Sequence, residues 1–134
     1  MGQKEKEALI RKNAPCYLYN KAQIADRCRR LKDALPEAGF LYSIKTNPFL
    51  PVLKTVAEQE FGADAASGAE VLLAEQAGIP PEQIFYSAPG KTRKDLDRAW
   101  GRCVWIADSL GELERLDRMA AERGERAGVG VRVN

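Results

Sequence analysis

The sequence predicts an α/β fold with about five parallel strands, arranged as part of a (βα)8 barrel. Short apolar runs alternate with helix-length segments, and several helical segments open on a capping signal such as Ser67-x-x-Glu70. Strand, cap and helix in repeated order are typical of βα units and therefore of a parallel sheet. Polar residues within the strands or at their ends favour a barrel over an open doubly wound sheet, because barrel strands point side chains into a site at their carboxyl ends. A full barrel takes about 200 residues or more, so a chain of 134 residues supplies only part of one.

The expected strands are short apolar runs at 16–19, 40–44, 63–66, 84–88, 103–107 and 129–134. The expected helices are 21–35, 49–61 (helical from about Pro51), 68–78, 93–100 and 110–124. The first of these helices has an apolar face of Ile24, Cys28, Leu31 and Leu35 at helical spacing. Before the second helix, Asn47 fits a cap and Pro48 fits the first helical position.

Composition excludes several classes of function. The 21 basic and 19 acidic residues nearly balance, and no long basic run suggests nucleic-acid binding. No apolar run approaches the roughly 20 residues of a membrane span, and the charged N-terminus lacks the apolar core of a signal peptide. Cys16, Cys28 and Cys103 form no CxxC pair, and the chain has no histidine, so no metal site is expected. Reduced thiols indicate a cytoplasmic protein.

Lys45 ends the apolar run Phe40–Ile44 and is the first candidate for chemistry. Alternation along the strand places Leu41, Ser43 and Lys45 toward the barrel axis. A partly desolvated lysine at the mouth of a barrel can act as a Schiff-base nucleophile. A lysine that extends from a strand end into solvent is an equally good interpretation of the pattern alone.

Three further charged residues are candidates near the strand ends. Asp64 would lie on the second barrel strand beside Lys45, where it could hold the ammonium or orient a cofactor, or simply belong to a turn. Glu70 is better explained as part of the cap begun by Ser67. Arg132 lies in an apolar strand and needs a partner, for which an anionic ligand, Asp64 or another ion pair within the barrel would serve.

The stretch "APGKTRKD" (88–95) contains Gly90-Lys91-Thr92, which invites comparison with a nucleotide-binding loop. A Walker A motif needs a glycine five positions before Gly90, and Phe85 stands there. The nucleotide-binding interpretation therefore fails. An ordinary βα turn remains, although a helix start can still meet an anion.

Taken in order, "APCYLYNKAQI", "FLYSIKTNPFLPVLKTVAE", "FGADAASGAEVLLAEQAGIPPEQIFYSAPGKTRKDL", "ADSLGELERL" and "VGVRVN" resemble the N-terminal part of the fold type III pyridoxal-phosphate decarboxylases. This family includes diaminopimelate, ornithine and arginine decarboxylases, and "GKTRKDL" and "VRVN" look closest to the diaminopimelate branch. The resemblance runs from about Ala14 through nearly the whole chain.

The resemblance implies an alanine-racemase-like (βα)8 barrel, of which residues 21–134 would form the first half. It implies that Lys45 holds pyridoxal 5'-phosphate as a Schiff base and that Ser43, Asp64 and Arg132 surround the cofactor. Residues 1–20, including the strand at 16–19, would associate with the β domain of the full protein. A cytoplasmic homodimer acting on a small amino acid, as in lysine biosynthesis, is the expected full-length form. Neither membrane nor nucleic acid is an expected partner.

The resemblance also implies that this chain is a fragment. The ring-stacking histidine, the glycine-rich phosphate loop and the β domain of the family would lie beyond residue 134, so the isolated fragment is expected to be inactive. Two alternatives stay open. One is an amino-acid racemase or a non-catalytic carrier of pyridoxal phosphate on the same fold. The other is an inactive half-barrel that self-associates through its open sheet edges.

Overall fold

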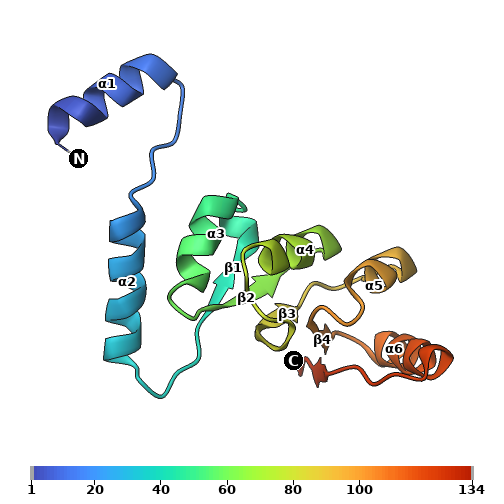
Figure 1. Cartoon of the computed structure of the whole chain (residues 1–134). Coiled ribbons are helices and arrows are strands. Elements are labelled where there is room, and N and C mark those ends of the chain that lie inside the picture. Colours follow the sequence, from blue (N-terminus) through green and yellow to red (C-terminus); the bar gives the residue numbers. More distant parts are fainter. Residues whose placement is uncertain (1, 134) are drawn as a thin grey trace.

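The computed structural model describes residues 2–133 and contains one sheet of five parallel strands in chain order. The strands are β1 (Leu41–Ser43), β2 (Gly62–Ala65), β3 (Ile84–Tyr86), β4 (Val104–Ala107) and β5 (Val129–Val131). The helices between them are α3 (Leu50–Ala57), α4 (Gly68–Gln76), α5 (Arg93–Ala99) and α6 (Leu110–Arg123). Two short 3-10 turns, η1 (Ile44–Thr46) and η2 (Pro81–Gln83), complete the connections. The predicted partial barrel is confirmed (Figure 1).

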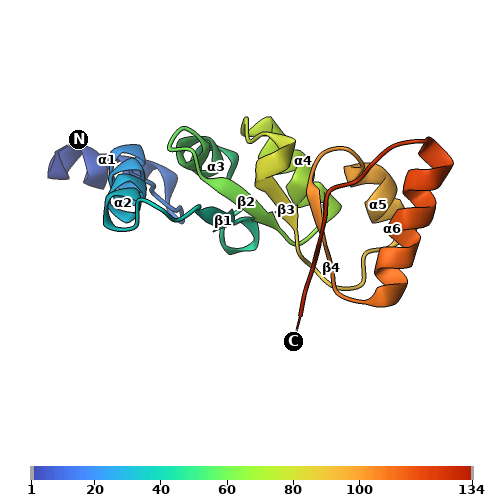
Figure 2. The same ribbon diagram turned by 90° about the horizontal axis from the view of Figure 1, so that it is seen from below.

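The core lies between the strands and the helices, which follow one another along one side of the sheet (Figure 2). Side chains alternate across the sheet, so Ala63 and Ala65 of β2 are buried in the core while Asp64 between them faces the other way. The main core cluster includes Ile44, Leu53, Val71, Ile84, Leu96, Trp105 and Leu116. On the opposite, inner face, Leu41 of β1 is 48% exposed. The sheet is therefore covered by helices on one face only.

Four of the expected helix caps form. The side-chain oxygens of the capping residues accept hydrogen bonds from backbone amides three residues later, at Asn20, Ser67, Thr92 and Ser109. Helix α3 begins at Leu50, close to the predicted start at about Pro51, but the predicted cap at Asn47 was wrong. Phe49 is its N-cap, and the Oδ1 of Asn47 accepts from the amide of Phe49 at 3.1 Å. Asn47 therefore closes a turn that precedes the helix, and Pro48 lies outside the helix. The reason is that the 3-10 turn η1 forms the end of the segment 40–44 that was expected to be a strand.

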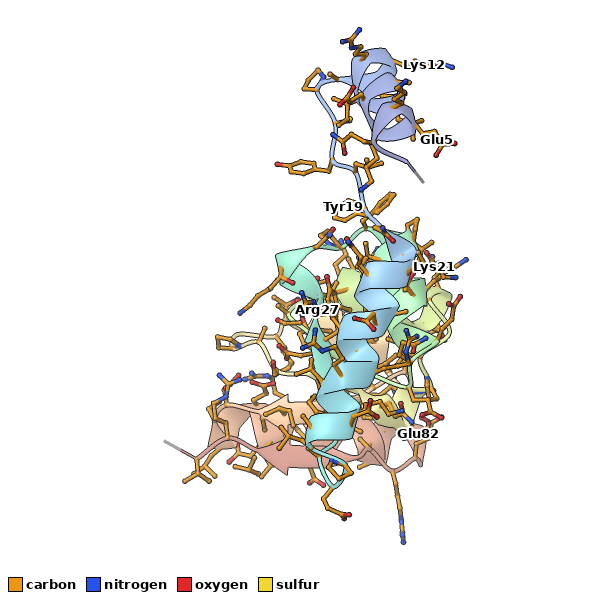
Figure 3. The ribbon with its side chains drawn as sticks, turned by 90° about the vertical axis from the view of Figure 1, so that its left-hand side faces the viewer. Glu5, Lys12, Tyr19, Lys21, Arg27 and Glu82 are labelled. Carbon is orange, nitrogen blue, oxygen red and sulfur yellow. The ribbon has the colours of Figure 1, made fainter. Side chains whose placement is uncertain are left out.

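The first 20 residues differ most from the prediction, whereas the helix predicted at 21–35 forms as α2 (Lys21–Ala34). A helix that was not predicted, α1 (Gln3–Asn13), precedes α2 and extends away from the sheet (Figures 1 and 3). The predicted strand at 16–19 is absent, because residues 16–20 have no neighbouring strand to take up their backbone hydrogen bonds. Tyr17 in this segment is 91% exposed.

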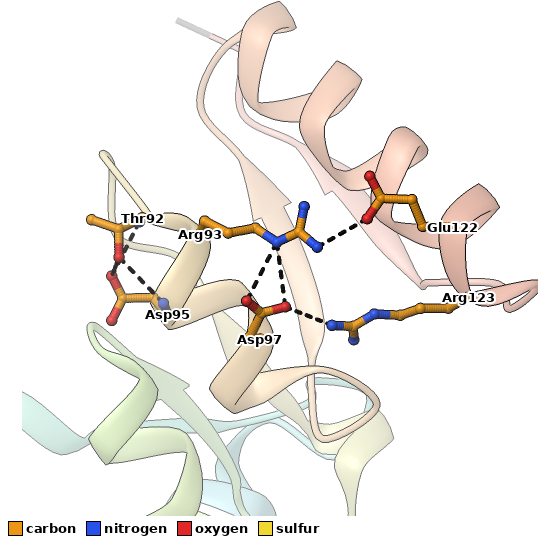
Figure 4. Close-up of polar contacts among 6 residues, drawn as sticks. All are labelled: Thr92, Arg93, Asp95, Asp97, Glu122 and Arg123. Carbon is orange, nitrogen blue, oxygen red and sulfur yellow. Dashed lines mark hydrogen bonds and ion pairs between the residues drawn. The ribbon is translucent and has the colours of Figure 1, made fainter.

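Helices α5 and α6 are joined by charged side chains (Figure 4). Arg93 of α5 contacts Asp97 on its own helix and Glu122 of α6 at 2.9 Å, and Arg123 of α6 returns to Asp97 at 2.6 Å. These side chains are partly or largely exposed, so solvent screens each pair and weakens its contribution to stability. Their main effect is to fix how the two outer helices lie against each other. None of the helices within residues 2–133 is long and apolar enough to cross a membrane.

Candidate functional site

Polar side chains on the inner face meet at the carboxyl ends of the strands, one from each strand or from the residue just after it. They are Ser43, Asp64, Ser87, Asp108 and Arg132. The register explains this arrangement, since Ser43 pairs with Asp64 and each of the others continues the alternation of its own strand. An active site is expected at this edge of a parallel barrel.

Lys45 lies two residues beyond the inner-face residue Ser43, in the turn η1, and is exposed. Its neighbour Ile44 is completely buried in the main core, and Tyr42 packs against the same core from β1. This burial anchors the strand end from the helix side. Tyr42 and Ile44 thus face the helices as the alternation predicts, whereas Lys45 is an exposed residue of the 3-10 turn, beyond the strand to which the alternation applies.

Asp64 is held by two hydroxyl groups rather than by a lysine. The Oγ of Ser43 donates to its Oδ2 at 3.0 Å, and the Oγ of Ser87 donates to its Oδ1. Both carboxylate oxygens therefore have a neighbouring-strand partner, which fixes the plane of the carboxylate. The expected contact between Asp64 and the ammonium of Lys45 is not among the ion pairs of residues 2–133.

Arg132 follows β5 directly and finds its acidic partner in Asp108. Its Nη1 lies 3.1 Å from the Oδ1 of Asp108, and its Nη2 donates to the carbonyl oxygen of Ser87 at 2.6 Å. The sequence left several partners open for Arg132. Among the protein groups, Arg132 forms an ion pair within the barrel, and its partner is Asp108 rather than Asp64. Ser87 joins the two halves of the site, because it contacts both Asp64 and Arg132.

Behind these residues lies a buried ion pair that the sequence did not reveal. Lys91 has a fully buried side chain, and its Nζ lies 2.5 Å from the Oε1 of Glu112, whose side chain is only 2% exposed. The same Nζ donates to the carbonyl oxygen of Ile106 at 2.8 Å and lies 3.9 Å from the Oδ2 of Asp108. The GKT stretch thus starts an ordinary helix with Thr92, while its lysine reaches inward.

Two groups near this ion pair stay neutral over the ordinary pH range. Burial raises the pKa of Tyr86, whose ring faces the Nζ of Lys91 at 5.1 Å, to about 12. Burial also raises the pKa of the Cys103 thiol to about 12. Neither group supplies a base or a nucleophile at neutral pH.

Glu70 has the structural role that the sequence favoured. Its Oε2 accepts from the amide of Ala66 at 2.7 Å, and its own amide donates to the Oγ of Ser67 at 3.2 Å. Both interactions satisfy free amides at the start of α4. The carboxylate therefore faces the helix terminus.

Sequence reasoning missed Ser87, Asp108, Lys91 and Glu112. The first two carried a usable signal, since each is a polar residue that continues the inner-face alternation one step past an apolar strand. Lys91 and Glu112 carried none, because each also fits a turn or a helix cap and their contact spans 21 positions in sequence. Within the described residues there is no cluster of His, Cys, Asp and Glu that could hold a metal ion.

Comparison with known proteins places this arrangement in a family. Residues 21–134 match the family model for the pyridoxal-dependent decarboxylase, pyridoxal binding domain. Diaminopimelate decarboxylase of Zymomonas mobilis is 35% identical over 127 residues, covering 90% of this chain and 30% of that protein. The protein of the same name from Aquifex aeolicus is 37% identical over 122 residues, covering 90% of this chain and 29% of that protein.

Solved structures agree with the sequence relatives. The crystal structure of Helicobacter pylori diaminopimelate decarboxylase complexed with L-lysine has a TM-score of 0.86 and 28% identity, over 97% of this chain and 34% of that one. Vibrio vulnificus lysine/ornithine decarboxylase complexed with putrescine has a TM-score of 0.78 and 26% identity, over 95% and 38%. The chain spans about a third of the length of the relatives it matches. The chain belongs to the pyridoxal-dependent decarboxylase family, and its residues 21–134 match the pyridoxal binding domain of that family.

Proposed function

We propose that this chain supplies the cofactor-binding part of an amino-acid decarboxylase and that Lys45 is the residue that binds pyridoxal phosphate covalently. The observation that carries the proposal is the exposed amine of Lys45 at the carboxyl end of β1, on the edge where the inner-face polar residues gather. The family match supports a pyridoxal-binding role for the domain.

The residues present fit the chemistry of pyridoxal phosphate. Its aldehyde needs a primary amine, which Lys45 offers, and its anionic oxygens need a cation. The side chain of Arg132 is 41% exposed, and its protein contacts use Nη1 and Nη2, which leaves further N–H donors of the guanidinium for a ligand. Asp64, fixed by two serine hydroxyls, is an acceptor of defined direction. We assign cofactor binding to Lys45, Ser43, Asp64 and Arg132.

When bound, pyridoxal phosphate supplies an electron sink for the bond that breaks when the α-carboxylate leaves as carbon dioxide. The role of the chain's own residues is to hold Lys45 and Asp64 in position for the cofactor. The buried side chain of Ile44 anchors the backbone on which Lys45 is mounted. Ser43 and Ser87 hold the Asp64 carboxylate in one orientation, so that it meets its ligand without reorganisation.

The relatives named diaminopimelate decarboxylase support that amino acid as the substrate of the full-length protein, which we also take to be a homodimer in the pathway to lysine. The ornithine-like alternative is supported by the likeness to the Vibrio enzyme. The three cysteines are free thiols, in keeping with a cytoplasmic location.

The proposal is tested by covalent mapping. Pyridoxal phosphate is added to the chain, the visible band of the imine is recorded, and borohydride then fixes the label for peptide mapping. Label on Lys45, lost in Lys45→Ala and kept in Lys54→Ala, is the expected result. Lys54 is a suitable control because it is an exposed lysine on the neighbouring helix α3. Label spread evenly over many lysines, or no label at all, would sink the proposal for this chain.

A further inference from the structure

We propose that Asp108 is a positioning residue that fixes the guanidinium of Arg132, and that the buried Lys91 holds Asp108 in place from the other side. The inference rests on the proposed function, in which Arg132 meets an anionic oxygen of the cofactor. It assigns a role to a carboxylate and a lysine that are not themselves placed against the cofactor.

Arg132 needs such a fixing residue because it lies at the last strand and is partly exposed. Its backbone amide donates to the carbonyl oxygen of Ala107 at 2.9 Å, which ties its main chain to the end of β4. Its side chain is long, and its Nη2 donates to the carbonyl oxygen of Ser87 at 2.6 Å. Asp108, the residue after Ala107, meets the guanidinium at 3.1 Å with a side chain only 14% exposed. Main chain and side chain of Arg132 are thus held by two consecutive residues.

Asp108 is itself held from behind. Its Oδ1 contacts Arg132, while its Oδ2 is buried and accepts no hydrogen bond from the described residues. The Nζ of Lys91 lies 3.9 Å from this Oδ2. A carboxylate with a cation on each side cannot turn away without leaving one charge unbalanced. Rotation of Asp108, and with it of Arg132, is therefore opposed by the buried lysine.

The balance of charge explains how four charged side chains can lie together, partly buried, behind the strand ends. Lys91 and Arg132 are positive, and Asp108 and Glu112 are negative, so the four charges sum to zero. The pair of Lys91 and Glu112 is almost completely buried, whereas Arg132 reaches the surface. The chain of contacts runs from α6 through the β3–α5 loop to the strand ends. It connects the packing of an outer helix to the direction of a side chain in the candidate site.

The first test needs no cofactor. The Nε–H and Nη–H signals of Arg132 are followed by NMR in the 15N-labelled chain and assigned with Arg132→Lys. We expect restricted guanidinium rotation in the unaltered chain and fast rotation in Asp108→Asn. Asp97→Asn is the matched control, because Asp97 also lies between two arginines but on the outer helices. Equal rotation in the unaltered chain and in Asp108→Asn would overturn the inference.

The second test measures pyridoxal-phosphate affinity in about 1 M salt, where the Debye length falls to about 3 Å and long-range effects of the removed charge are screened. Asp108→Asn is expected to weaken binding about two- to tenfold, the effect of having to order one long side chain on binding. In an Arg132→Gln background the same substitution should change nothing, and thermal unfolding checks that each variant is folded. An equal loss in both backgrounds would mean that Asp108 does not act through Arg132.

The two proposals can fail separately. Absence of the Lys45 label refutes the proposed function and leaves the rotation of Arg132 to decide the role of Asp108. Label on Lys45 with an unrestrained Arg132 retains the proposed function and refutes the role of Asp108.

Discussion

Replacing Lys91 by methionine should be among the most damaging single substitutions in this chain. The change removes a fully buried ammonium and leaves Glu112, 2% exposed, as a buried carboxylate without its partner. Removing one partner of a buried ion pair typically costs about 3–5 kcal/mol, because the remaining charge stays in a poorly solvated site. The carbonyl of Ile106 also loses its donor at 2.8 Å, which adds to the loss.

The double variant Lys91→Met/Glu112→Leu tests whether the unpaired carboxylate of Glu112 causes the loss of stability. With both charges gone, the desolvation penalty disappears, and apolar side chains can fill the site between β4 and α6. What remains is the unpaired carbonyl of Ile106, worth about 1–3 kcal/mol, and the buried Oδ2 of Asp108, which loses the ammonium 3.9 Å away. The double variant should therefore be more stable than Lys91→Met alone, although it carries one more substitution.

Urea unfolding followed by circular dichroism measures the free energies, and the combined fluorescence of Trp105 in the core and Trp100 packed against it reports on tertiary packing. The two single variants and the double variant form a cycle whose coupling energy is read directly. Strictly additive losses, or a loss below about 1 kcal/mol for Lys91→Met, would show that the pair does not carry the energy assigned to it here.

Other substitutions test other parts of the chain. Hydrogen bonds from the Thr92 hydroxyl and amide lower the pKa of Asp95 from its ordinary value of 3.8, so its stabilising effect is complete above that value and is lost as pH falls through the lower folded pKa. The stability difference between the unaltered chain and Asp95→Asn should be present at pH 7 and vanish in strong acid, and a difference that persists unchanged in strong acid would contradict this cap. A thiol reagent at pH 8 should label exposed Cys16 rapidly and Cys103 only at the rate of unfolding, because burial raises the Cys103 pKa to about 12. Fast labelling of Cys103 in the folded chain would contradict the burial that the core shows.

The barrel part of the fold could be predicted because its signals are local. Ser67 and Glu70 identify the start of α4 from four residues, and the alternation of Ala63, Asp64 and Ala65 separates a core face from an inner face. The N-terminal region could not be predicted in this way. The segment 16–19 has the composition of a strand, but a strand exists only beside a partner, and pairing is not a property of the segment itself. Conversely, α1 buries none of its residues, so it has no apolar face for the sequence pattern to reveal.

The candidate site likewise has one part that could be predicted from the sequence and one part that could not. The inner-face position of Ser43 and Asp64 follows from counting residues along two strands. The partner of Arg132 does not, because Asp64 and Asp108 both lie near the carboxyl end of a strand. Only the order of strands in the sheet decides which of them is adjacent. With β4 beside β5, Asp108 is the neighbour, while Asp64 lies three strands away from β5. Covalent attachment at Lys45 stays a prediction.

The order of the strands also has a consequence for how the site comes together as the chain emerges during synthesis. Each strand pairs only with its neighbours in sequence, so each βα unit can add to the previous one in the direction of synthesis, and early folding requires no distant loop closure. Ser43 and Asp64 meet after the second strand forms, but Arg132 reaches Asp108 only with the fifth. Opening from the β1 end would release Lys45 while leaving the pair of Arg132 and Asp108 intact. Hydrogen exchange should therefore find the two ends of the site protected to different degrees, as two separately opening units.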